Sequence, residues 1–428
     1  GSGTAVTLAC GATQTGFGRT GTVDWDTTPK TATFSAVSGD GFFCNTTSSA
    51  FTCNLPAGSA GAIVSLADYA GTWQTNNLTV SPNGSEKIGG TNADVILNTE
   101  GQSVTFVYVD GTQGWVNVQD STSNERGNPY IVATGGTETT SGNCKIHTFT
   151  GPGTFNVSKV ACCAANNQVS YLVVAGGGGA RGNYAGGAGA GGFREDKSPV
   201  TPYTASPLEG AGPITVTATS FPITVGAGGT APGTINSRGT NGANSVFSTI
   251  TSAGGGGGGA GSSPSPISDG PGSPGGSGGG AGGYGPGTKS GGVGNTPPTN
   301  PIQGNDGGQM TGAPGTGYSS AGGGGAGGGG TAQSNPGSPV PGTNGGAGVA
   351  TSISGSSVTR AGGGGGGGWG AAGGAGGIGG GGTGSPSGGD SGTSNGTENT
   401  GGGAGGGGAT PTINTGGSGI VIIRYKFQ

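Results

Sequence analysis

Apolar residues in the first part of the chain fall into short alternating runs that predict β-strands. The run at 31–37 (TATFSAV) is followed by Ser-Gly-Asp-Gly, which indicates a strand and a hairpin turn. Similar short runs occur at 62–66, 78–80, 95–97 and 104–109, with turn signals such as Pro82-Asn83-Gly84 between them. No long window has helical spacing. We therefore predict a strand-rich segment at 1–50 and a small all-β module at 51–122.

The pattern changes after residue 122. Residues 123–142 are polar and contain Gly127-Asn128-Pro129, which predicts a linker. From 143 to the end at 428 we predict a glycine-rich domain, in which short apolar runs indicate strands within 145–175, 213–226 and 419–426. Most of the 113 glycines of the chain lie in this domain. They form tracts near 175–179, 185–192, 253–261, 275–283, 321–330, 361–368, 371–382 and 401–408.

Glycine, serine and proline without a strict period are typical of a flexible, low-complexity tail. The apolar runs at 171–175 and 420–425 argue against a tail, because they lie at the two ends of the glycine region and are suited to closing a domain. The absence of a strict Gly-X-Y repeat excludes a collagen triple helix.

Ordering a glycine tract has to overcome a backbone entropy cost of about 1–2 kcal/mol per residue. Side chains cannot supply this, so backbone hydrogen bonds, each worth about 0.5–1.5 kcal/mol net, must do so. Polyproline-type helices leave their amides free to bond to neighbouring helices, and glycine permits the close approach. A nine-residue tract would span about 28 Å. We predict packed polyglycine II helices flanked by short β-strands, with Pro- and Ser-rich end loops and essentially no α-helix.

Composition excludes some classes of protein. Charged residues make up 7% of the chain and the net charge is −4, so there is no clustered basic surface for nucleic acid. No apolar run approaches the roughly 20 residues needed to cross a bilayer, so we expect no membrane insertion. The chain begins at Gly1, which we interpret as a truncation, a processed end or a cloning remnant.

The six cysteines allow several interpretations. Cys44 and Cys53 have a spacing that suits a disulfide across a hairpin, although sequence does not establish pairing. The residue types that bind zinc come together in one segment, at Cys144, His147, Cys162 and Cys163. Adjacent cysteines rarely occupy two corners of one tetrahedron, so structural cysteines are the favoured interpretation and we predict no metal site.

Catalytic patterns are weak. His147 is the single histidine and lies in an alternating run, which favours a strand residue. Lys289-Ser290 follows a threonine, so the phosphate-loop pattern fails. Acid pairs for glycan cleavage would have to come from residues that lie beside turns: Asp24, Asp26, Asp68, Asp94 and Asp110. We expect a protein without catalytic residues or cofactors.

Binding residues are expected in the varied spacers between glycine tracts, because loops on rigid elements carry recognition. Aromatic side chains are favoured there because they anchor glycan or protein contacts at low entropy cost. The alternative for each candidate is packing against a neighbouring glycine helix. The candidate contacts are Ile267, Asp269, Tyr284, Met310, Tyr318 and Trp369.

Several segments carry a family resemblance. The runs at 147–157 (HTFTGPGTFNV), 171–179 (YLVVAGGGG) and 416–425 (GGSGIVIIRY) resemble the glycine-rich domain of bacteriophage tail-fibre proteins, as do 192–195 (GFRE) and 223–229 (ITVGAGG). The predicted glycine-helix bundle is similar to the distal adhesin tip of T-even phages. Residues 55–115 resemble a β-unit that recurs in fibres of marine phages. The adjacent Cys162 and Cys163 depart from this pattern.

The resemblance implies a homotrimeric virion fibre that is located outside the cell. Its amino-terminal end would join other tail proteins, and it would bind a host-surface glycan or outer-membrane protein without catalysis. One alternative is a purely structural capsid appendage or surface filament subunit. Another is a tailspike enzyme that depolymerises glycans.

Overall fold

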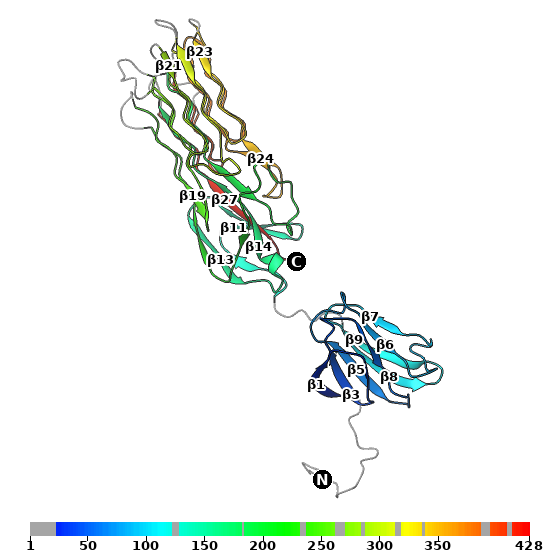
Figure 1. Ribbon diagram of the computed structural model, residues 1–428. Helices are drawn as coiled ribbons and strands as arrows, with labels where there is room; N and C mark the ends of the chain where they lie inside the picture. Colours follow the sequence, from blue (N-terminus) through cyan, green and yellow to red (C-terminus); the bar gives the residue numbers. More distant parts are fainter. Residues whose placement is uncertain are drawn as a thin grey trace, which may run out of the picture. The chain divides into compact units, whose positions relative to one another are not determined.

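The computed structural model describes residues 23–121, 128–181, 184–231, 237–261, 270–283, 287–312, 318–335, 339–386, 394–408 and 413–428. The chain divides into two compact units, Gly1–Arg126 and Gly127–Gln428 (Figure 1). The described residues are all-β, and one 3-10 turn, η1 (Ala164–Asn167), is the helical element among them. None of the described residues forms a helix long and apolar enough to cross a membrane.

The first unit consists of two sheets that enclose one core. The larger sheet has the order β1 (Asp24–Lys30), β3 (Asp40–Cys44), β5 (Ile63–Asp68), β8 (Ser103–Asp110), β9 (Gly114–Ser121). The smaller has the order β2 (Phe34–Ser35), β4 (Phe51–Asn54), β6 (Leu78–Ser81), β7 (Val95–Leu97). Alternating apolar residues of both sheets fill the space between them, including the fully buried Leu66, Phe106 and Leu78, and Trp73 from the turn between β5 and β6 joins them.

The early strands of this unit alternate between the two sheets. β1, β3 and β5 pair in parallel in one sheet, and β2, β4 and β6 pair in parallel in the other. The predicted hairpin at 31–41 is therefore wrong, because β2 and β3 belong to different sheets. The predicted boundary at residue 50 is also wrong, since β3 pairs directly with β5 across it.

The second unit begins with two larger sheets. One has the order β10 (Val132–Thr134), β13 (Gly153–Lys159), β18 (Ser220–Thr224), β19 (Ser245–Phe247), β20 (Ile250–Ser252). The other has the order β11 (Thr137–Ser141), β12 (Cys144–Phe149), β27 (Ile420–Lys426), β14 (Gln168–Val174), β16 (Phe193–Asp196), and β17 (Ile214–Thr215) also pairs with β14. The predicted linker at 123–142 was too long, because β10 and β11 lie within it.

The last strand lies in the middle of its sheet. β27 pairs on one side with β12 and on the other with β14, so that Ile423 lies between His147 and Tyr171. The predicted apolar strands at the two ends of the glycine region are confirmed, and they pair with each other to close the domain.

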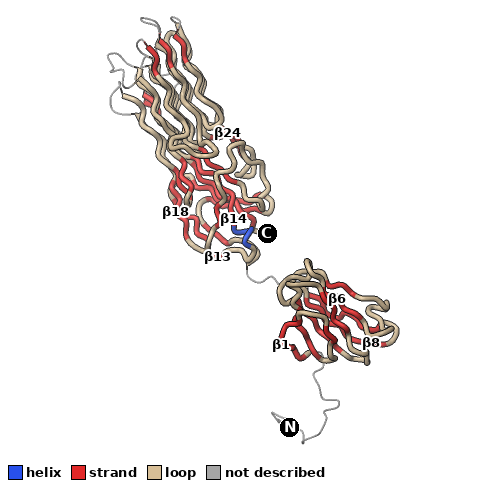
Figure 2. The backbone as a smooth tube through the Cα atoms, in the orientation of Figure 1, coloured by secondary structure: helices blue, strands red, loops and turns tan. Residues whose placement is uncertain are grey.

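The glycine tracts run side by side from these sheets to the opposite end of the unit (Figure 2). Among the described residues of the bundle, the strands form short ladders: β15 (Ala180–Arg181) with β26 (Ile413–Asn414), β21 (Gly287–Lys289) with β22 (Met310–Gly312) and β23 (Gln333–Asn335), and β24 (Val349–Thr351) with β25 (Val358–Arg360). Elsewhere the described tract residues lie outside strands and bond to one another through backbone amides.

The hydrogen-bond partners of a tract repeat every three residues. In the tract at 185–192, the amides of Ala185, Ala188 and Gly191 donate to the tract at 401–408, while those of Gly186, Gly189 and Gly192 donate to 253–259. The intervening amides of Gly187 and Ala190 donate to 321–324. Carbonyls of the same tract accept from three further tracts, at 175–179, 277–283 and 361–368. A β-strand has a repeat of two, whereas a repeat of three is expected for polyproline-type geometry.

Candidate functional site

Three aromatic rings from distant parts of the sequence meet at one end of the glycine bundle. The ring centroids of Tyr184 and Tyr318 are 5.1 Å apart and stacked, and Trp369 lies 5.1 Å from Tyr184 and 4.6 Å from Tyr318 in edge-to-face contact. All three residues are half-buried. We call this group the aromatic cluster. Its geometry is that of favourable aromatic pairs, and half-burial leaves part of each residue accessible.

Each member of the cluster is placed by the end of a glycine tract. Tyr184 begins the tract at 184–192, and Trp369 ends the tract at 361–369. Tyr318 lies just before the tract at 321–330. These ends lie together because neighbouring tracts are bonded in register along their length. At their opposite ends the three tracts pack against the sheet of β14 and β27 through Ala190, Ala326 and Ala361, so the cluster is at the end of the bundle remote from that sheet, as are β21 and β23 (Figure 1).

Hydrogen bonds from neighbouring tracts hold the backbone of the cluster residues. The Tyr184 amide donates to Gly408 O at 2.9 Å, and Tyr184 O accepts from the Ser320 hydroxyl at 2.6 Å. The Trp369 amide donates to Val340 O at 3.0 Å and to Ser319 Oγ at 3.1 Å. Tyr184 has φ of 58°, a left-handed conformation that costs a non-glycine residue about 1–3 kcal/mol. The surrounding bonds hold the backbone of Tyr184 in this conformation.

The structure places the predicted contact residues differently from one another. Tyr318 and Trp369 belong to the aromatic cluster, whereas Met310 is fully buried against Ala281 and Ala321. Met310 is therefore a core residue of the bundle and not a surface contact. Ile267, Asp269 and Tyr284 lie outside the described residues. Tyr184 was missed; the available signal was an aromatic residue immediately before a glycine tract, as at Tyr318.

A buried lysine lies in the short ladder near the same end. Lys289 is opposite Met310 in the pairing of β21 with β22 and is buried. Burial lowers the pKa of its amine to about 8, because the charged form loses contact with water.

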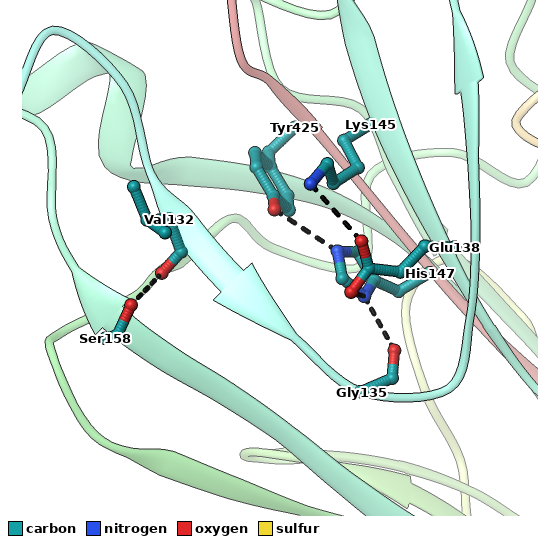
Figure 3. A network of polar contacts seen from close by, with 7 residues as sticks. All are labelled: Val132, Gly135, Glu138, Lys145, His147, Ser158 and Tyr425. Atoms are coloured by element: carbon teal, nitrogen blue, oxygen red, sulfur yellow. Dashed lines mark hydrogen bonds and ion pairs between the residues drawn. The ribbon is translucent and has the colours of Figure 1, made fainter.

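His147 is fully buried in the second unit, where its imidazole contacts Gly135 and Tyr425 (Figure 3). Its Nδ1 is 2.6 Å from Gly135 O, and its Nε2 is 3.2 Å from the Tyr425 hydroxyl. The imidazole stacks on Tyr425 and meets Phe155 edge-on. Burial lowers its pKa, although Gly135 O and the nearby Glu138 carboxylate oppose this effect. Both ring nitrogens are engaged within the fold, which confirms His147 as a buried strand residue.

Two of the acidic residues considered for glycan cleavage, Asp26 and Asp110, accept hydrogen bonds from residues close to them in sequence. Asp26 accepts from the Thr28 amide and pairs with Lys30 at 2.8 Å. Asp110 accepts from the amides of Thr112 and Gln113, each at 2.8 Å. Such contacts stabilise the carboxylate form, and they lower the pKa of both Asp26 and Asp110.

The cysteines remain as thiols in the described part of the chain. Cys44 and Cys53 are buried free thiols in different sheets, and burial raises both pKa values, that of Cys53 to about 12. Because β3 and β4 belong to different sheets, the hairpin on which the Cys44–Cys53 pairing was based is not formed. Cys144 is buried, whereas Cys162 and Cys163 are exposed. Within the described ranges, no group of three or more His, Cys, Asp or Glu side chains could hold a metal ion.

Comparison with known proteins assigns the second unit to a family. The family model described as a glycine-rich domain matches residues 148–426, from β12 into β27. No curated protein matches the chain. The matched region contains the two closing strands, the described glycine tracts and the aromatic cluster. It spans well over half of the chain, and the protein therefore belongs to the glycine-rich domain family.

Proposed function

We propose that this chain is a bacteriophage tail-fibre protein that binds the host-cell surface without catalysis, through the end of the bundle that carries the aromatic cluster. The observation that carries the proposal is the convergence of Tyr184, Tyr318 and Trp369 on that end. The resemblance of residues 147–157 and 416–425 to tail-fibre domains supports it.

A rigid support is the first requirement of such a site, since preorganised side chains lose less entropy on binding. The bundle meets it because tract amides are bonded to neighbouring tracts along their length. We infer that these tracts are polyglycine II helices, and the three-residue repeat of bonding partners supports this inference.

Suitable chemistry is the second requirement. Tyrosine and tryptophan combine a large apolar face with a polar edge, and they dominate binding energy in many interfaces. The ligand would be a glycan or an outer-membrane protein of the host. The same proposal places the protein in the virion as a homotrimer. The other end of the chain would join further tail proteins.

A purely structural appendage is the second candidate. The observation that favours it is the contact of the three rings with one another, since mutual packing could serve only to close the bundle end. The two functions differ in whether removing a ring affects binding or only stability.

Binding of the purified chain to a panel of intact bacterial cells tests the proposal. We expect Tyr318→Ala to weaken saturable binding by about tenfold or more, which corresponds to about 1.4 kcal/mol. Tyr69→Ala is the matched control, because Tyr69 is 52% exposed on the first unit. Thermal unfolding of both variants checks that they are folded. Equal binding by both variants would exclude the aromatic cluster as the binding site. No binding to any cell type would favour the structural appendage.

A further inference from the structure

Two exposed thiols lie side by side in the connection between β13 and β14. Cys162 and Cys163 follow the end of β13 at Lys159 and precede η1, and both are exposed free thiols. The other described cysteines, Cys44, Cys53 and Cys144, are buried. Among the described cysteines, small oxidants in solution can therefore reach the thiols of the adjacent pair.

Adjacent cysteines can form only a strained disulfide. Consecutive Cα atoms are about 3.8 Å apart across a trans peptide, whereas the usual Cα separation in disulfides is about 4.4–6.8 Å. Closing the bond therefore requires the backbone between the residues to shift. Strained, exposed disulfides are easily reduced, which suits a reversible reaction better than a permanent staple.

The backbone around the pair is fastened to the beginning of the second unit. The Cys162 amide donates to Asn128 O at 2.8 Å, and the Asn166 amide donates to Cys163 O at 3.0 Å. The Asn166 side chain donates to Pro129 O at 3.0 Å. Residues 128 and 129 are the first described residues after the segment that joins the two units. A backbone shift at the pair would therefore disturb the hydrogen bonds that hold residues 128 and 129.

We propose that Cys162 and Cys163 form a redox-active dithiol that small disulfides such as oxidised glutathione convert to a vicinal disulfide. The thiolate of one cysteine attacks the small disulfide, forming a mixed disulfide and releasing one thiol. The second cysteine then attacks the protein sulfur of the mixed disulfide and releases the second thiol. The protein loses two protons and two electrons, and the small disulfide gains them to become two thiols. The Cys162–Asn128 hydrogen bond is lost in the oxidised form.

Glutathione buffers of increasing oxidation, applied to the full chain, test the chemistry. After alkylation of the remaining thiols, mass spectrometry of the peptide that contains both cysteines should show the loss of two hydrogens and no alkylation. Dithiothreitol should restore two alkylatable thiols. Retained glutathione on the wild type, a bond to Cys10, or copies cross-linked to one another would each overturn the proposal.

Single variants separate the two steps. Cys163→Ser and Cys162→Ser should each accumulate the glutathione adduct, because the second thiol that resolves it is missing. If the wild-type chain accumulates as much adduct as the variants, the second cysteine does not displace glutathione and the vicinal disulfide does not form.

Hydrogen exchange tests the link to Asn128. Exchange of the Cys162 and Asn166 amides should become faster in the oxidised wild type and should not change in oxidant-treated Cys162→Ser/Cys163→Ser chain. Oxidation without a change in exchange would overturn the coupling to Asn128. The proposed host binding does not enter either measurement, so the two proposals succeed or fail separately.

Discussion

A glycine inside the bundle is required because of the carbonyl it faces. A Cβ added at Gly187 would lie 2.0 Å from Gly364 O, and one added at Gly191 would lie 2.0 Å from Ala175 O. Both distances are far inside van der Waals contact, and the opposing atoms belong to backbone that is itself hydrogen-bonded. Alanine is accommodated elsewhere in the same tract, at Ala185, Ala188 and Ala190. The mixture of glycine and alanine is therefore determined by position and is not a compositional bias alone.

We predict that Gly187→Ala lowers the free energy of unfolding of the second unit by about 3 kcal/mol, because neighbouring tracts must move apart. Gly151→Ala is the control, since a Cβ at Gly151 would have no atom within 4 Å. Chemical denaturation should show a change of no more than about 0.5 kcal/mol for the control. Equal effects of the two substitutions would contradict the close packing of the tracts.

The buried imidazole of His147 makes the second unit sensitive to acid. Burial lowers its pKa in the folded state, so below the ordinary value of about 6.5 the unfolded chain binds the additional proton more readily. The contribution to stability is therefore complete above about pH 6.5 and decreases as the pH falls below it. We expect the unfolding midpoint to decrease between pH 7.5 and 5, and His147→Gln to reduce that slope. An unchanged slope would assign the acid sensitivity to other groups.

At the scale of elements, the central strand β27 pairs with β12 and β14, which lie more than 240 residues earlier in the sequence. It is paired on both sides, and Ile423 is fully buried in the core shared with Phe155 and Tyr171. We predict that Ile423→Ala costs about 2–5 kcal/mol of stability. Ile413→Ala removes the same atoms from a residue of β26 that is 62% exposed, so it should cost less than about 0.5 kcal/mol. Thermal unfolding of both variants measures the difference.

The same elements explain how far the sequence could predict the fold. The run at 420–423 is apolar on both faces, which is typical of a central strand, and a strand is present there as predicted. The alternation of β1 to β6 between two sheets was missed, because a period of two indicates which face is buried but not which strand is the partner. Likewise, repeats of glycine predict tracts but not their neighbours. Tyr184 could therefore not be joined to Tyr318 and Trp369 from sequence.

At the scale of the whole molecule, the two compact units have separate cores. Trp73 and Trp115 are buried in the first unit, whereas the core of the second surrounds β14 and β27. Both units bury large side chains, and the second unit adds glycine tracts whose described residues rely on backbone hydrogen bonds. Cooperative unfolding extends only as far as the contacts that couple residues.

We therefore predict two calorimetric transitions for the full chain, and substitutions should assign them. Leu66→Ala, in the first core, should lower only one transition, and Ile423→Ala should lower only the other. Fluorescence would report chiefly on the first unit, because its buried tryptophans become exposed to water when that core opens. A single transition displaced equally by both substitutions would mean that the units unfold together, and hence that the segment between them transmits stability.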